Sequence, residues 1–478
     1  MLFNSFEFLI FFPLVIAVYF LLPHRWRWLE LLFASCVFYM AFVPEYILIL
    51  GLTIVVDYYA GIWIENTQGK TKKRYLVISI IVTCLILFVF KYFYFVNDNL
   101  LLIANFFGLH YPTNFIKIIL PIGLSFHTFQ SLSYVIEVYR GKQKAEKHFG
   151  VYALYVMYFP QLVAGPIERP QNVLHQFYIP QSFDVRRISS GLKLMAWGFF
   201  KKVVIADRLS VFVNLVYNDM DHYTGWYMIL ATVFFAFQIY CDFSGYSDIA
   251  IGISRVIGID LMKNFDRPYF SQSISEFWRR WHISLSTWFK DYVYIPMGGN
   301  RVSSSRQYLN LFTTFSLSGI WHGANWTYVF WGSLNGVYLI IAILINRYDS
   351  FFKTKFQLPT FLLQLWNTLS TFVLICLAWV FFRANNFGDA FQIIYKMKFA
   401  SLEQLGVPLF PVNQYDFNLS ILFIGVLMVI EYFQKDRAIE EMINTKPLFW
   451  KWAAYVALIL IILNFGVFES QDFIYFQF

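Results

Sequence analysis

Charged side chains are scarce in this chain of 478 residues. Only 14% of its residues are charged, whereas about a quarter are charged in typical soluble domains, and 58% are hydrophobic. The mean hydropathy is +0.54. The net charge of +8 is modest, and loops beside membrane spans account for such an excess. The composition therefore predicts a membrane protein and gives no reason to expect nucleic-acid binding.

Cysteines, internal repeats and linkers are also scarce or missing. Three of the four cysteines, Cys36, Cys84 and Cys376, lie inside apolar runs, and Cys241 precedes an aspartate. No C-x-x-C motif occurs, which excludes a disulfide framework or a zinc knuckle as the organising feature. The missing repeat argues against a secondary transporter built from inverted repeats. Without a linker, we expect one integral membrane domain over residues 1–478.

Long apolar runs fill the sequence instead. Examples are residues 75–95 and 453–468, and each is long enough to cross about 30 Å of hydrocarbon as a helix. The first run lacks a basic segment and a cleavage site, so we expect an uncleaved span. Arg25 and Arg27 follow it, which places the N-terminus outside the cell.

Basic clusters alternate with neutral or acidic loops along the chain. The basic clusters are at 24–28, 69–74, 139–148 and 435–452. Counting between them predicts an all-α polytopic protein of about eleven to twelve spans, with both termini on the extracytoplasmic side. An aromatic tail, residues 469–478, then lies outside.

Two stretches do not resemble simple spans. Residues 155–170 are apolar but interrupted by Pro160, Pro166 and Pro170, which predicts a re-entrant or surface segment. Residues 259–306 are too charged to cross a membrane. We expect them to form cytoplasmic loops and helices against the bundle.

The second of these stretches contains His282. A single helix over 273–300 would gather aromatic residues with His282 on one face and charged residues on the other. The aromatic face holds Trp278, Trp281, His282, Leu285, Trp288, Phe289 and Tyr292. An interfacial amphipathic helix explains this pattern, and so does a site in which His282 has a chemical task.

His322 follows an apolar run and stands between Gly319 and Gly323. Small residues permit close approach of a backbone or a ligand. An ionisable group at membrane depth is a functional candidate. The alternative is a histidine that joins two helices by hydrogen bonds.

Other polar residues in apolar segments have a structural interpretation. Asp242, Asp248 and Asp57 each need a partner in the membrane; they either line a polar tunnel or act as buried struts, and the strut is favoured. His127 has no glycine or charge beside it, so we interpret it as a core histidine.

Five motifs, in this order, resemble those of the membrane-bound O-acyltransferases. They are LPIGLSFHTFQSLSYVIEVYRG (120–141), FPQLVAGPIERP (159–170), YCDFSGYSDIAIG (240–252), FWRRWHISLSTWFKDYVYIPMGGN (277–300) and LSGIWHGANWTYVFWG (317–332). The chain looks most similar to the bacterial branch that O-acetylates exported polysaccharides. His127 departs from the expected pattern.

The resemblance implies a ring of tilted helices in which a cytoplasmic funnel meets an extracytoplasmic one. It implies acetyl-CoA as the donor and assigns the two family histidines to His322 and His282. A metal site at these histidines would need a third ligand at close spacing, and none is evident, so no metal is expected.

The residues agree with acyl transfer to a hydroxyl. Such a reaction needs a base, and neutral histidine supplies one near pH 7. Asn325, His282 or a backbone N–H beside a glycine could stabilise the oxyanion. Further substrate-binding candidates come from the same motifs, although a solvated face also explains the charged ones: Arg279, Arg280, Lys290, Trp321, Asp242 and Ser244.

The chain ends in DFIYFQF. An aromatic belt at the lipid surface is one explanation. The ending is also similar to that of a small partner protein used by the D-alanyl-transferring branch of the family. That likeness makes Tyr475 a candidate acyl carrier. Tyr475 lies seven residues beyond Phe468, or about 23 Å when extended.

The resulting hypothesis is a bacterial cytoplasmic-membrane enzyme that passes acetyl from acetyl-CoA through Tyr475 to the outside. An SGNH-type esterase-like partner would then modify a secreted or cell-wall polysaccharide. An enzyme of the same fold with a D-alanyl donor is one alternative. A transporter is the alternative from another class.

Overall fold

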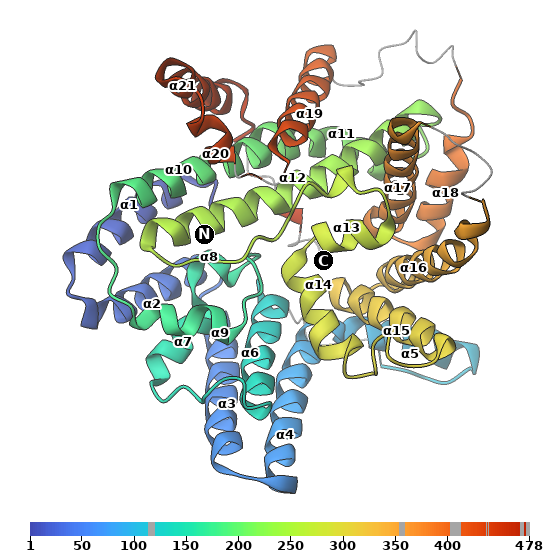
Figure 1. The fold of residues 1–478 in the computed structure, drawn as a ribbon. Coiled ribbons are helices and arrows are strands. Elements are labelled where there is room, and N and C mark those ends of the chain that lie inside the picture. The colour runs from blue at the N-terminus through green and yellow to red at the C-terminus, as the bar shows by residue number, and fades with distance from the viewer. Residues whose placement is uncertain are drawn as a thin grey trace. The chain divides into compact units, whose positions relative to one another are not determined.

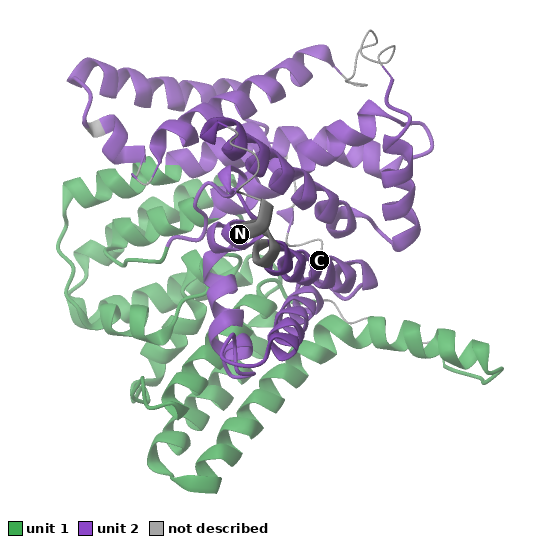
Figure 2. Cartoon of the chain, turned by 45° about the vertical axis from the view of Figure 1, so that its right-hand side comes forward, with its two compact units in different colours: residues 1–195, 247–262 green, residues 196–246, 263–478 purple. Residues whose placement is uncertain are grey.

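The computed structural model describes residues 1–112, 120–352, 359–401, 413–435, 437, 439–468 and 473–474, except for the side chains of 346–352 and 444. These residues form helices and connecting segments, with no strand among them. The chain forms two compact units, residues 1–195 with 247–262 and residues 196–246 with 263–478 (Figure 2). We call them unit 1 and unit 2.

Unit 1 contains the N-terminal helices, the first part of α10 and the last part of α12. Its elements, of which Figure 1 labels the α-helices, are α1 (Phe6–Leu21), α2 (His24–Met40), α3 (Tyr46–Asn66), α4 (Gly69–Leu87), the π-helix η1 (Phe88–Tyr92), α5 (Phe93–Phe106), α6 (Leu124–Tyr139), α7 (Phe149–Met157), α8 (Phe159–Leu162), α9 (Pro170–Val173), the 3₁₀-helix η2 (Leu174–Tyr178), most of α10 (Val185–Phe199) and the end of α12 (Trp226–Ile257).

A buried carboxylate joins three helices of unit 1. Asp57 of α3 accepts hydrogen bonds from Ser79 Oγ at 2.5 Å and Thr83 Oγ1 at 3.1 Å, both on α4. Ser131 of α6 donates a further bond to it. Asp57 is fully buried. It is therefore a strut between helices, as the sequence analysis favoured.

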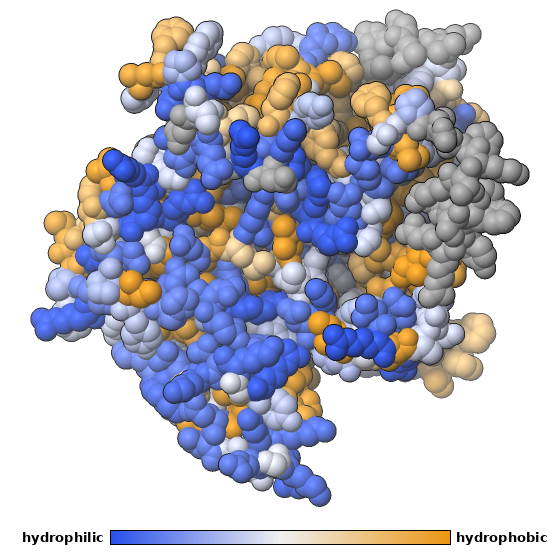
Figure 3. Space-filling view, viewed as in Figure 1, coloured by the Kyte–Doolittle hydropathy of each residue, from blue (hydrophilic) through white to orange (hydrophobic). Residues whose placement is uncertain are grey.

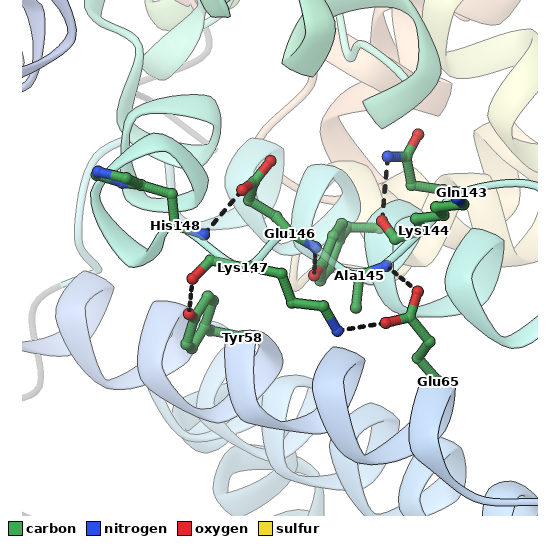
Figure 4. Close-up of polar contacts among 9 residues, drawn as sticks. Tyr58, Glu65, Gln143, Lys144, Ala145, Glu146, Lys147 and His148 are labelled. Carbon is green, nitrogen blue, oxygen red and sulfur yellow. Dashed lines mark hydrogen bonds and ion pairs between the residues drawn. The ribbon is translucent and has the colours of Figure 1, made fainter. Parts of the chain in front are cut away.

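The basic loop after α6 is fixed on α3 (Figure 4). Glu65 accepts a bond from the Ala145 amide at 2.9 Å and pairs with Lys147. Tyr58 donates to the Lys147 carbonyl at 2.6 Å. Hydrophilic side chains also cover the free end of the α3–α4 hairpin, at the bottom of Figure 3. The basic clusters at 69–74 and 139–148 therefore lie at helix ends on the surface of unit 1.

The proline-interrupted segment 155–170 is buried in unit 1, and only Arg169 is half-buried among residues 155–170. A surface position, one of the two alternatives from sequence, is therefore wrong. The short helices α7 and α8 leave irregular backbone that the protein itself surrounds. Irregular backbone inside a membrane protein is tolerated where protein or water satisfies its polar groups.

Unit 2 is built around the first two thirds of α12, which is buried from Phe234 to Tyr246. Its further elements are the π-helix η3 (Phe200–Ala206), α11 (Asp207–Asn218), the 3₁₀-helix η4 (Pro268–Phe270), α13 (Ile274–Arg280), α14 (Ile283–Phe289), the π-helix η5 (Lys290–Tyr294), α15 (Ser304–His322), α16 (Trp326–Phe352), α17 (Thr360–Arg383), α18 (Phe387–Met397), α19 (Gln414–Gln434), α20 (Ile439–Asn444) and α21 (Leu448–Phe465).

Seven helical stretches of the described chain are long and apolar enough to cross a membrane. They are Tyr46–Asn66, Gly69–Phe106, Trp226–Ile257, Trp326–Ile345, Thr360–Arg383, Gln414–Gln434 and Leu448–Phe465. This confirms an all-α polytopic membrane protein. The number is smaller than the eleven to twelve expected, because other apolar stretches form shorter helices, such as α1 and α6 with 16 residues each.

Candidate active site

His322 is the last residue of α15, in a tight helical hairpin with α16. The two helices lie side by side (Figure 1). Two glycines allow this approach: a Cβ on Gly319 would lie 2.3 Å from the Tyr328 carbonyl oxygen, and one on Gly332 would lie 2.3 Å from that of Phe315. Gly319 therefore serves the packing of α15 against α16, and a Cβ on Gly323 would likewise lie 2.2 Å from the Tyr328 ring.

Aromatic rings surround the His322 imidazole. Its centroid lies 4.9 Å from that of Trp321, 4.9 Å from that of Trp331 and 5.5 Å from that of Phe382. His322 is 5% exposed. Edge contacts of this kind fix the plane of a ring. The surroundings also keep water away from the imidazole.

His282 lies at a break between two short helices, so the single helix expected over 273–300 is wrong. α13 ends at Arg280, α14 begins at Ile283, and His282 has a left-handed φ of 44°. The break is stabilised by residues 264–266, which bond to both of its sides. The Asp266 amide donates to the Arg280 carbonyl at 2.9 Å, and the Ile283 amide donates to the Asn264 carbonyl at 2.8 Å.

The same segment holds the His282 side chain. Nδ1 of His282 lies 3.1 Å from Asn264 Oδ1, and Ser284 Oγ donates to that oxygen at 2.9 Å. Phe243 contacts the imidazole edge-on at 4.5 Å between centroids. His282 is 1% exposed, and burial lowers its pKa to about 3. The imidazole is therefore neutral at pH 7.

Trp321 links the two histidines. Its ring centroid lies 4.9 Å from that of His322 and 6.5 Å from that of His282. Two imidazoles that are 40 residues apart in sequence thus share one aromatic cluster in unit 2. The sequence predicted both residues and Trp321 as site candidates, and the structure brings the three together.

Asp242 and Ser244 face a pair of lysines from η3. Asp242 Oδ1 lies 2.7 Å from Lys202 Nζ, and Lys201 Nζ donates to Ser244 Oγ at 3.0 Å. Gly245 allows this contact, because a Cβ there would lie 2.8 Å from the Gly198 carbonyl oxygen. Asp242 is thus a buried strut, as favoured from sequence. Asp248 is half-buried in unit 1.

Residues 473 and 474 contact this region of α12. Phe473 and Ile474 are 1% and 2% exposed. The Phe473 ring lies 5.0 Å from that of Tyr246, and the Ile474 amide donates to Asp242 Oδ2 at 2.8 Å. Tyr475 lies outside the described residues. Its two predecessors are bound to the helix whose Phe243 contacts His282.

The remaining substrate-binding candidates lie at exposed positions, in an ion pair or in a helix cap. Arg279 and Lys290 are exposed, and Arg280 pairs with Glu276 at 2.6 Å. Asn325 caps α16 by accepting from the Thr327 amide at 3.0 Å, and it donates to the Asn385 carbonyl at 3.1 Å. Both ends of the Asn325 side chain are thus engaged in structure.

Sequence reasoning missed Asn264, Lys202 and the break at His282. Asn264 stands in a polar loop with nothing in its spacing to connect it with His282. Lys202 had a signal, since the chain continues with apolar residues at 203–206. A lysine in such a stretch needs a carboxylate, and Asp242 needed a partner.

The structure is that of a helical membrane protein with two buried histidines in one aromatic cluster. The model of the membrane-bound O-acyltransferase family matches residues 147–384, which include both histidines. The chain is 40% identical to the probable alginate O-acetylase AlgI of Pseudomonas aeruginosa over 404 residues, 83% of this chain and 75% of that protein.

Two further relatives carry different names. The peptidoglycan O-acetyltransferase of Helicobacter pylori is 36% identical over 406 residues, 79% of this chain and 74% of that protein. The teichoic acid D-alanyltransferase of Bacillus subtilis is 26% identical over 293 residues, 58% of this chain and 71% of that protein. The chain belongs to the membrane-bound O-acyltransferase family. It is a multi-pass membrane O-acyltransferase.

Proposed function

We propose that the chain transfers acetyl from cytoplasmic acetyl-CoA to the extracytoplasmic side, with Tyr475 as the acyl carrier, for O-acetylation of an exported or cell-wall polysaccharide. The observation that carries this proposal is the position of Phe473 and Ile474. These residues are buried against Asp242 and Tyr246, next to the Phe243 ring that contacts His282. Tyr475 follows directly.

His322 acts as the base in this proposal. It removes the phenol proton as the Tyr475 oxygen attacks the thioester carbonyl carbon. A C–O bond forms, the C–S bond breaks, and the proton passes on to the sulfur of CoA. An acceptor hydroxyl, on the SGNH-type partner or the polysaccharide, then attacks the aryl ester. The bond between the acetyl carbonyl carbon and the Tyr475 oxygen breaks, and the proton of the acceptor hydroxyl passes to the Tyr475 oxygen.

The aromatic cluster supports the first step in two ways. Rings around His322 at 4.9–5.5 Å exclude water, which protects a reactive thioester from hydrolysis. His282 is neutral, and its Nδ1 carries the proton because Asn264 Oδ1 can only accept. Its Nε2 can therefore accept a hydrogen bond from a substrate hydroxyl. We assign the oxyanion of the tetrahedral intermediate to a backbone N–H beside a glycine.

The test is to map acetyl groups on the purified protein after incubation with carbon-13-labelled acetyl-CoA. Tyr475 becomes labelled in the wild type, and the label is lost in Tyr475→Phe and reduced at least about 100-fold in His322→Gln. His127→Gln is the matched control, because His127 is also buried but lies in unit 1. Unchanged labelling in His322→Gln would contradict the role of the base.

The same experiment distinguishes the donor. The relative from Bacillus subtilis is named a D-alanyltransferase, so a D-alanyl thioester is the competing donor to offer. Label from acetyl-CoA alone supports the proposal. Label from the D-alanyl donor alone would replace acetyl by D-alanyl and keep the roles of His322 and Tyr475.

A further inference from the structure

The carboxylate of Asp242 divides its two oxygens between two parts of the protein. Oδ1 lies 2.7 Å from Lys202 Nζ on η3, and Oδ2 accepts the Ile474 amide at 2.8 Å. Asp242 is 3% exposed. A strut that served only to neutralise Lys202 would need one oxygen. The second oxygen binds the main chain of the C-terminal tail.

Lys202 is itself held from two sides. Its Nζ lies 2.7 Å from Asp207 and 2.7 Å from Asp242, and all three side chains are buried. Lys202 therefore fixes the orientation of the Asp242 carboxylate. Charge-assisted hydrogen bonds to a backbone N–H are about twice as strong as neutral ones. The Ile474 amide thus binds to one oxygen of a carboxylate whose other oxygen is in an ion pair with Lys202.

The chain is bound at two points around residues 469–472. Before them, the Val467 amide donates to the Val203 carbonyl of η3 at 2.9 Å. After them, Phe473 packs against Phe243 and Tyr246, with centroids 6.2 Å and 5.0 Å away. Asp242 and Tyr246 are four residues apart and share one face of α12. That face receives both Phe473 and Ile474.

We propose that Asp242, oriented by Lys202, is a positioning residue that binds the tail through the Ile474 amide and sets the place of Tyr475. Tyr475 follows Ile474 directly in the sequence, so the bond at the Ile474 amide acts on the chain immediately before the proposed carrier. This inference rests on the proposed function, since it supplies the geometry that Tyr475 needs. The hydrogen bond between Asp242 and the Ile474 amide can be measured in the absence of acetyl transfer.

The first measurement is hydrogen exchange of the C-terminal peptide by mass spectrometry. The Ile474 amide exchanges slowly in the wild type, because a buried bond protects it. We expect Asp242→Ala to increase its exchange rate at least about tenfold. Asp207→Asn is the matched control, because it disturbs the same lysine but leaves the tail acceptor in place. Equal exchange rates in Asp242→Ala and the wild type would overturn the inference.

The second measurement is the rate of Tyr475 labelling from carbon-13-labelled acetyl-CoA. Ile474→Pro removes the donor, and Ile474→Ala keeps it. We expect Ile474→Pro and Asp242→Ala each to lower the rate about 100-fold, since misplacement by 1 Å has effects of that size. Ile474→Ala stays within about threefold of the wild type. The double variant with Ile474→Pro and Asp242→Ala should label no more slowly than either single variant, because each change removes the same hydrogen bond.

Rescue separates positioning from charge balance. Asp242→Asn removes the charge but keeps Lys202 with Asp207 and an oxygen acceptor for the Ile474 amide, so it should label faster than Asp242→Ala by about tenfold or more. Multiplying effects in the double variant, or no rescue, would overturn the inference while wild-type labelling upheld the proposed function. A wild type with no label on Tyr475 would refute the carrier role, and the exchange experiment would still decide on the Asp242 contact.

Discussion

A methyl group at Gly319 is a direct test of how the α15–α16 hairpin places His322. A Cβ at this position would lie 2.3 Å from the Tyr328 carbonyl oxygen and 3.2 Å from the Gly332 Cα. Ordinary contact begins at 3.4 Å, so Gly319→Ala must separate the two helices by about 1 Å. Both nearest atoms belong to the backbone, so no side-chain rotation can relieve the clash.

Two quantities follow from this displacement. Overpacking of a well-packed interface costs about 1–3 kcal/mol of folding free energy. The end of α15, and His322 with it, moves relative to Trp331 of α16, and a shift of about 1 Å lowers the rate of a positioned reaction about 100-fold. We therefore expect Gly319→Ala to lower both the melting temperature in detergent and the transfer rate per folded molecule.

Gly425 is the matched control, because a Cβ there meets nothing within 4 Å. Alanine in the interior of a helix is favoured over glycine by about 0.5–1 kcal/mol. Gly425→Ala should therefore raise the melting temperature slightly and leave transfer unchanged. The assay is thermal unfolding in detergent combined with labelling by carbon-13 acetyl-CoA. If Gly319→Ala behaves like Gly425→Ala, the packing argument for His322 is refuted.

Three further predictions concern other residues. Asp57→Ala leaves three buried hydroxyls without their acceptor and should cost about 3 kcal/mol of stability, seen as a lower melting temperature with an unchanged transfer rate per folded molecule; an unaltered melting temperature would contradict the strut. His282 has a folded pKa of about 3 against about 6.5 unfolded, so its contribution to stability is complete above pH 6.5 and is lost as the pH falls toward 3. At pH 5 the loss amounts to about 2 kcal/mol, so melting temperatures at pH 7.5 and pH 5 should differ less in His282→Gln than in the exposed control His222→Gln; equal differences would refute it. Asn264→Ala removes the oxygen beside His282 Nδ1 and should lower kcat about tenfold with KM unchanged, whereas a change in KM alone would indicate a role in binding donor.

The residues that carry unusual physical chemistry could be predicted from the sequence. A histidine between glycines, a histidine among tryptophans and aspartates in apolar segments all conflict with their surroundings, so each requires a partner or a task. His322, His282, Asp57 and Asp242 were found in this way. Apolar length likewise predicted the spanning helices at 75–95 and 453–468.

The tertiary partners could not be predicted. Asn264 holds His282 across 18 residues, and the backbone bonds of residues 264–266 break a pattern that is periodic as one helix. The periodicity of apolar residues indicates which side chains share a helix face. It does not indicate where another segment forms hydrogen bonds with the backbone and interrupts the helix. The burial of 155–170 was also not decided from the sequence, since an apolar segment with prolines fits either a re-entrant or a surface segment.

The roles of Tyr475 and His322 together form the central claim, and a single-turnover experiment tests them most directly. Protein in liposomes is mixed with carbon-13-labelled acetyl-CoA, quenched at successive times and digested, and the acetylated peptides are quantified. The account predicts that label appears on Tyr475 in the wild type as free CoA is released, and that neither happens in His322→Gln. CoA release with label on another residue, or on none, would contradict it.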